Sequence, residues 1–281
     1  MKLAVITDTS AAMAEKYRSY DNLHILDIPI FIDGKTYKSS QLTDEDFYAL
    51  MAASDGVPKT SQPSIIELTE VLDSLKMQGY THVLGLFLTS GISGFYQNAH
   101  YLQDEYAPMT VAFPETFITS SPLGYMVETA LENAQAGKSW EEILSVLATQ
   151  EKEDAAFMLA DDLRWLSKSG RLSNGSAILG TLLNIKPVLT FSSDGKVELF
   201  EKVRTTKKMM SRMKELLLEN ADKEDSKVYV IHSLADERAQ ELYDYAIAEN
   251  YQHVELVTFG PVIATHLGLG AVAYATSPYN H

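Results

Sequence analysis

The chain has 281 residues, enough for a substantial core and for two domains or one large one. With 23 Lys plus Arg against 38 Asp plus Glu, the formal net charge is −15, so the basic face of a nucleic-acid-binding protein is not expected. Cysteine is absent, which excludes disulfides and thiolate chemistry. No apolar run approaches the about 20 residues of a transmembrane segment, and we expect a cytoplasmic protein.

Strand-like and helix-like segments alternate over the first half of the chain. Apolar runs predict strands at residues 2–7, 24–32, 82–88 and 109–113. Caps and helical periodicity predict helices at residues 47–53, from 64 to 78, from 95 onwards, at 122–136 and at 139–150. This alternation indicates parallel strands with helices packed on both faces of one sheet.

The pattern changes after about residue 153. Strands are predicted at 155–159, 186–191, 196–204, 227–232, 254–259 and 271–275, and helices at 161–167, 172–183, 205–220 and 236–249. The turn Ser193-Asp194-Gly195 joins two of the strands as a hairpin. A hairpin within an alternating pattern indicates a mixed sheet, so the second half is predicted to be α+β.

The loop Thr89-Ser90-Gly91-Ile92-Ser93-Gly94 joins an apolar strand to the start of a helix. Free backbone N–H groups and the helix dipole favour a small anionic group at such a join. Gly91 and Gly94 would let a ligand approach the backbone. The alternative is that Ser90 or Ser93 only caps the helix.

Three other segments carry polar side chains that could contact a ligand. Lys59-Thr60-Ser61-Gln62-Pro63 also precedes a helix, where a capped loop is the alternative. Arg171 in a turn and Arg204 at a strand end could face a phosphate or simply be solvated. His266 lies in an apolar segment, where a structural histidine is the alternative. No nucleotide-binding, metalloprotease or EF-hand motif is present.

Taken in order, these segments resemble the DegV family of bacterial fatty-acid-binding proteins, the lipid-binding subunits of fatty acid kinase. The resemblance is carried by Ile6-Thr7-Asp8-Thr9-Ser10, Lys59-Thr60-Ser61-Gln62-Pro63, Ser90-Gly91-Ile92-Ser93-Gly94-Phe95-Tyr96-Gln97, Ser169-Gly170-Arg171-Leu172, Ile185-Lys186-Pro187-Val188, Lys202-Val203-Arg204-Thr205 and Gly260-Pro261-Val262-Ile263. It implies a three-layer α/β/α domain with a parallel sheet and carboxylate-binding loops at residues 1–153. A two-layer α+β domain with a mixed sheet, at 154–281, is expected to close over the ligand.

The resemblance also implies one bound long-chain fatty acid, with no further cofactor and no metal. Thr60 and Ser93 match positions that hold the carboxylate, and His266 matches a residue near the head group. Ser61 and Gly94 belong to the same motifs and are expected at the same place.

Arg171 and Arg204 match basic positions associated with the kinase and with phosphate transfer, and we expect both to be exposed. The implied partner is an ATP-dependent fatty acid kinase subunit, with transient contact to a membrane surface and without nucleic acid. Asn184 stands where some relatives have lysine, and no role is inferred for it.

Two classes of function follow. In the first, the protein is a carrier that buries an acyl chain, which is favoured by roughly 0.8 kcal/mol per methylene, and presents the carboxylate to a separate kinase. In the second, it is a stand-alone acyl hydrolase or transferase with Ser93 as nucleophile and His266 as base. The sequence supplies no group to orient His266, which favours the carrier.

Overall fold

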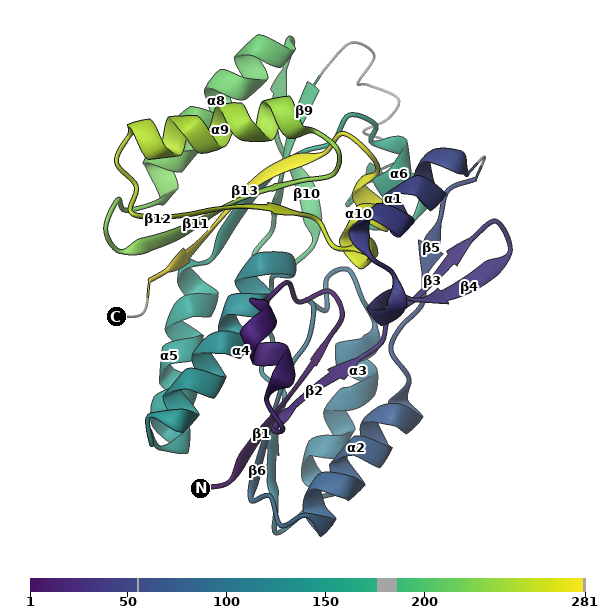
Figure 1. Cartoon of the computed structure of the whole chain (residues 1–281), viewed down its shortest axis with the longest axis vertical. Helices are drawn as coiled ribbons and strands as arrows, with labels where there is room; N and C mark the ends of the chain where they lie inside the picture. Colours follow the sequence, from purple (N-terminus) through teal and green to yellow (C-terminus); the bar gives the residue numbers. More distant parts are fainter. Residues whose placement is uncertain (55, 176–185, 280–281) are drawn as a thin grey trace.

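The computed structural model of the protein describes residues 1–54, 56–175 and 186–279 (Figure 1). Most of the helix predicted at 172–183 lies outside the described residues, and so does Asn184. Within the described residues, the strands form a parallel sheet, a mixed sheet and a small antiparallel sheet. The two larger sheets come from the two halves of the chain.

The parallel sheet belongs to the first half. Its strands, in spatial order, are β2 (Leu23–Leu26), β1 (Leu3–Asp8), β6 (His82–Leu86) and β7 (Thr110–Ala112). Every residue of β1 is buried, because helices cover both faces of the sheet. One face packs on α4 (Ser120–Gln135), and the other packs on α2 (Ile65–Met77) and α3 (Phe95–Ala99). The predicted three-layer α/β/α arrangement is confirmed.

The mixed sheet belongs to the second half. Its order is β10 (Val197–Val203), β9 (Lys186–Phe191), β8 (Ala155–Leu159), β13 (Val272–Pro278), β11 (Ser226–His232) and β12 (His253–Thr258). Only β11 and β12 are parallel, and the other pairs are antiparallel. The outer face packs on α8 (Thr206–Asn220) and α9 (Asp236–Ala248) (Figure 1). The inner face turns toward α4 and α5 (Trp140–Glu153), so the two-layer prediction is also confirmed.

The predicted single strand at 24–32 is wrong, because the chain changes sheet in its middle. The carboxylate of Asp27 accepts hydrogen bonds from the backbone N–H groups of Ser39 (2.8 Å) and Ser40 (3.3 Å), which draws the chain out of the parallel sheet. The residues that follow form the small antiparallel sheet, in the order β4 (Lys35–Lys38), β3 (Pro29–Ile32) and β5 (Lys59–Thr60).

The remaining elements are short. They are α1 (Asp44–Ala53), α6 (Arg164–Lys168), α10 (Pro261–Leu267) and 3-10 helices at Glu15–Ser19, Ser39–Gln41 and His100–Asp104. Sequence analysis assigned no element to α10, whose start fits the preference of proline for the first helical position. It packs against α1, β3 and β5, and the hydroxyl of Tyr48 in α1 donates to the backbone oxygen of Phe259 (2.7 Å) just before it.

Candidate ligand-binding site

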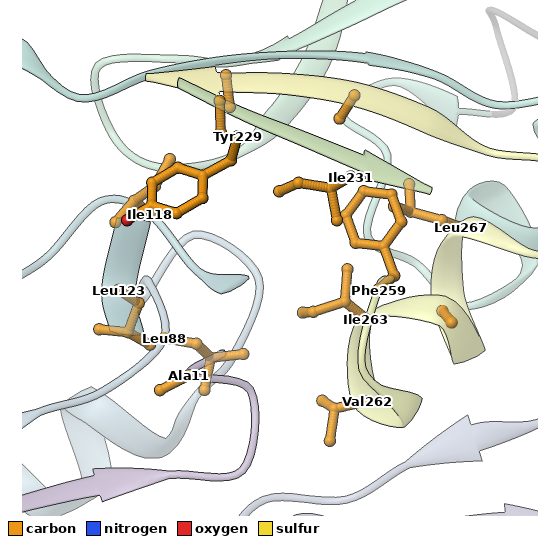
Figure 2. Close-up of a cluster of buried hydrophobic side chains, with 14 of the residues drawn as sticks. Ala11, Leu88, Ile118, Leu123, Tyr229, Ile231, Phe259, Val262, Ile263 and Leu267 are labelled. Carbon is orange, nitrogen blue, oxygen red and sulfur yellow. The ribbon is translucent and has the colours of Figure 1, made fainter. Parts of the chain in front are cut away.

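A cavity of about 560 Å³ lies between the parallel sheet and the mixed sheet. Its size is within the range of small-molecule sites, about 300 to 1,000 Å³. Most of its walls are apolar, and Figure 2 shows side chains from both halves of the chain facing one another across it. The apolar lining consists of Ile28, Leu88, Ile92, Ile118, Pro122, Ala156, Met158, Leu166, Phe191, Val197, Ile231, Phe259, Val262, Ile263, Leu267, Ala273 and Ala275.

Small side chains on the mixed sheet leave room for this cavity. Strand β13 alternates, so that Val272 and Tyr274 pack among the helices of the outer face, whereas Ala273 and Ala275 line the cavity. Ala275 lies opposite Ala156 of β8, so two alanines meet on the inner face. Larger residues at these positions would occupy the space that the cavity now provides.

Polar side chains from both halves of the chain gather at one part of the cavity. Thr60, Ser61, Ser93, Gly94 and His266 all line it, as their predicted common site requires. The hydroxyl oxygen of Thr60 lies 2.7 Å from Nε2 of His266, which links β5 to α10 across the two domains.

His266 is neutral at physiological pH. Burial, together with a smaller contribution from the charge of Arg171, lowers its pKa to about 3. Its other ring nitrogen, Nδ1, is buried and has no hydrogen-bond partner among the described residues. If Nε2 carries the proton, it donates to the hydroxyl oxygen of Thr60, and the O–H of Thr60 is free to donate elsewhere. If Nδ1 carries the proton, the O–H of Thr60 donates to Nε2, and the N–H at Nδ1 is free. Either tautomer therefore leaves one donor for a ligand oxygen.

The loop that carries Ser93 is held by the second half of the chain. The hydroxyl of Thr89 accepts from the backbone N–H of Gly91 (3.1 Å) and donates to the backbone oxygen of Gly195 (3.2 Å) in the β9–β10 turn. A Cβ atom on Gly91 would lie 2.2 Å from the carbonyl carbon of Gly195. Because Ser93 N–H donates to the backbone oxygen of Thr89 (3.2 Å), this interdomain contact positions Ser93.

A second contact joins α3 and the Ser93 loop to the segment that carries Thr60. The side-chain amide of Asn98 donates to Oε1 of Gln62 (2.8 Å), and a Cβ atom on Gly94 would lie 2.7 Å from Nε2 of Gln62. Glycine at 94 therefore allows the close approach. The hydroxyl oxygen of Ser93 accepts from the N–H of Phe95 (3.3 Å) in the turn that leads into α3, and it still has an O–H to donate.

The two arginines are placed differently from one another. Arg204 is exposed, as predicted, and does not line the cavity. For Arg171 the predicted exposure is wrong: it is half-buried, lines the cavity and donates from Nε to the backbone oxygen of Ile92 (3.3 Å). Gly170, with φ +74°, turns the chain back so that the guanidinium reaches the Ser93 loop. Burial lowers the pKa of Arg171.

Thr89 and Gly195 were not predicted as supports of the Ser93 loop, since nothing local marks a contact between residues so distant in sequence. The alanines of β13 were not predicted either, although alternation of small and large residues over 271–275 was a visible signal. Within the described residues, no group of three or more His, Asp or Glu could hold a metal ion. Among the same residues, no helix is both long enough and apolar enough to cross a membrane.

The fold and the site define an α/β protein with a mostly apolar cavity between a parallel sheet and a mixed sheet, and with several polar residues in the cavity wall. Residues 2–278 match the family described as "Uncharacterised protein, DegV family". The chain therefore belongs to the DegV family, and the resemblance found in the sequence is confirmed.

Relatives support this assignment over the full length. The DegV domain-containing protein YqaC of Lactococcus lactis is 65% identical, over 99% of this chain and 99% of the relative. Among solved structures, the fatty acid binding DegV family protein SAG1342 of Streptococcus agalactiae has a TM-score of 0.95 and 48% identity, covering 100% of both chains. DegV of Bacillus subtilis, named a fatty acid binding protein, has a TM-score of 0.87 and 33% identity, covering 99% of both chains.

Proposed function

We propose that this protein binds a long-chain fatty acid, with the acyl chain in the cavity and the carboxylate beside Thr60, Ser93 and His266. The cavity carries the proposal, because its walls are apolar while several hydrogen-bond donors converge at one part of it. The similarity to SAG1342 and to DegV of Bacillus subtilis, both named as fatty acid binding, supports the same ligand class.

The lining suits both ends of such a ligand. An enclosed acyl chain gains roughly 0.8 kcal/mol per methylene group on leaving water. The carboxylate loses hydration and needs hydrogen bonds in return. Thr60 or His266 offers one donor in either tautomer and Ser93 offers a hydroxyl, while the half-buried guanidinium of Arg171 adds positive charge nearby.

We further propose that the protein is a non-catalytic carrier in the cytoplasm, which presents the carboxylate to a separate ATP-dependent kinase subunit and exchanges lipid by transient contact with a membrane surface. The geometry favours this over the hydrolase alternative. Nε2 of His266 faces Thr60 rather than Ser93, and a histidine with a pKa of about 3 is a weak general base.

Native mass spectrometry of the purified protein tests the ligand. We expect a co-purifying fatty acid, or one that binds after removal of endogenous lipid and addition of stearic acid. A protein that binds no fatty acid under either condition contradicts the proposal, and turnover of an acyl ester that depends on Ser93 would favour the hydrolase.

The kinase role is tested separately with Arg204→Ala. Lys202→Ala is the matched control, because Lys202 is also exposed and lies two residues before Arg204, near the end of β10. We expect Arg204→Ala to lower acyl-phosphate formation by a purified kinase subunit with ATP, while fatty-acid affinity stays within about twofold, because an exposed charge contributes little to binding. If both variants support normal phosphorylation, Arg204 does not contact the kinase.

A further inference from the structure

The N-terminus of α4 brings buried hydroxyl groups to the cavity, away from the polar region around His266. Thr119 and Ser120 line the cavity and are only 5% and 4% exposed. The next residue, Ser121, is equally buried but lines a separate polar pocket of about 570 Å³. Serine and threonine therefore form part of the wall between the cavity and this polar pocket. The proposed function assigns no role to Thr119 and Ser120, which face the cavity.

Ser120 is the least satisfied member of this group. Its side-chain oxygen is buried and has no hydrogen-bond partner within the described part of the chain. Its backbone adopts φ +60°, the left-handed region that a serine rarely occupies, and is fixed there by a bond from Ala12 N–H to the Ser120 carbonyl (3.1 Å). The fold therefore holds Ser120 in place against its backbone preference, and its buried hydroxyl is unfavourable unless a ligand or a water molecule pairs with it.

The helix start adds a second preference for an oxygen acceptor. α4 has 16 residues, and its N-cap residue Thr119 makes no side-chain cap bond. The Thr119 hydroxyl instead donates to the hydroxyl of Ser10 (3.0 Å). The side chain of Thr119 therefore accepts from none of the first-turn N–H groups of α4, and the helix dipole is positive at this end.

This region lies across the cavity from the helix that carries His266. Ile118 and Leu123, which flank Ser120 in sequence, face Ile263 and Leu267 of α10 in Figure 2. A ligand whose carboxylate is held beside His266 can therefore pass Ser120 with its chain. A plain alkyl chain leaves that hydroxyl unpaired, whereas a chain that carries an oxygen can form a hydrogen bond with it.

We propose that the cavity is built for a fatty acid that carries a second oxygen function, a hydroxyl or keto group, along its chain, and that Ser120 is the residue that hydrogen-bonds it. The proposal rests on fatty-acid binding as the protein's function. The proposal predicts a preference between ligands. When the oxygen lies at the position on the chain that meets Ser120, the oxygenated fatty acid loses less affinity relative to the plain fatty acid than it would in an entirely apolar cavity.

The test measures the affinity of lipid-free protein for stearic acid and for a panel of hydroxystearic acids that differ in the position of the hydroxyl. Ser120→Ala removes the hydroxyl, and Ser120→Gly removes it while suiting the left-handed backbone, so one of the two should fold normally. Ser121→Ala is the matched control, because it removes a neighbouring hydroxyl that does not line the cavity.

The quantity compared is the affinity for a hydroxystearic acid divided by the affinity for stearic acid. For at least one isomer, we expect this ratio to be roughly fivefold or more lower in the Ser120 variants than in the wild type, and to be unchanged in Ser121→Ala. If the ratio is the same in all proteins for every isomer, Ser120 holds only water and the proposal is overturned. Failure of the wild type to bind stearic acid and every isomer would instead refute the proposed fatty-acid binding.

Discussion

Replacing Ala275 by leucine should shorten the acyl chain that the protein prefers. Ala275 lies on the cavity face of β13 opposite Ala156, and a leucine there would extend into the cavity. Its added atoms displace about three methylene groups of ligand, each worth roughly 0.8 kcal/mol. A chain that fills the wild-type cavity should therefore lose roughly 2.4 kcal/mol, about fiftyfold in affinity, whereas a chain about three carbons shorter should lose little.

Isothermal titration with a series of saturated fatty acids measures this shift directly. The matched control is Ala155→Leu, since Ala155 is half-buried on the opposite face of the same sheet and does not line the cavity. We expect the control to bind every chain length as the wild type does. An Ala275→Leu protein that folds normally and loses the same factor for every chain length, or nothing at all, would show that the acyl chain does not pass Ala275.

Three further outcomes are expected. Ser93→Ala should lower fatty-acid affinity roughly tenfold to a hundredfold, because a hydrogen bond to a charged group is lost. Unchanged affinity with a lower melting temperature would mean that Ser93 only stabilises the turn before α3. In Gly195→Ala, the new Cβ would lie 1.8 Å from the hydroxyl of Thr89 and would displace the loop that positions Ser93. The variant should therefore bind a fatty acid more weakly than the wild type does, with a smaller loss for the corresponding alcohol. Equal losses for the acid and the alcohol would contradict the positioning of Ser93 through this contact. Burial raises the pKa of Asp154 from 3.8 to about 8, so between these pH values the folded state holds a proton that the unfolded state has lost. The free energy of unfolding should therefore fall as pH rises through that window. Denaturation of Asp154→Asn should show a weaker fall with pH, and a pH profile identical to that of the wild type would contradict the raised pKa.

The elements that sequence alone could predict are those whose signals are local. The strand at 82–88 and its glycine-rich join show up as an apolar run and a change of composition. The helix that follows Ser139 was equally predictable, because Ser139 and Glu142 form a complete capping box in the structure. In each case the residues that decide the structure lie within one turn or one strand of each other.

The errors concern contacts between distant parts of the chain. The run 24–32 is apolar enough for one strand, but Asp27 finds its partners at Ser39 and Ser40, which no local pattern reveals. Arg171 was predicted to be exposed because it follows a turn, yet the backbone of Ile92 in the other half of the chain accepts its N–H. Burial of a side chain depends on what the other domain places beside it.

The same dependence explains why the candidate site residues could be named from the sequence while the geometry of the candidate site could not. Thr60 and His266 come from different domains, and their 2.7 Å contact exists only when β5 and α10 are together. The Ser93 loop likewise depends on the β9–β10 turn through Thr89 and Gly195. Both contacts join the first half of the chain to the second, so the positions of Thr60 and Ser93 in the cavity wall depend on how the two halves pack together.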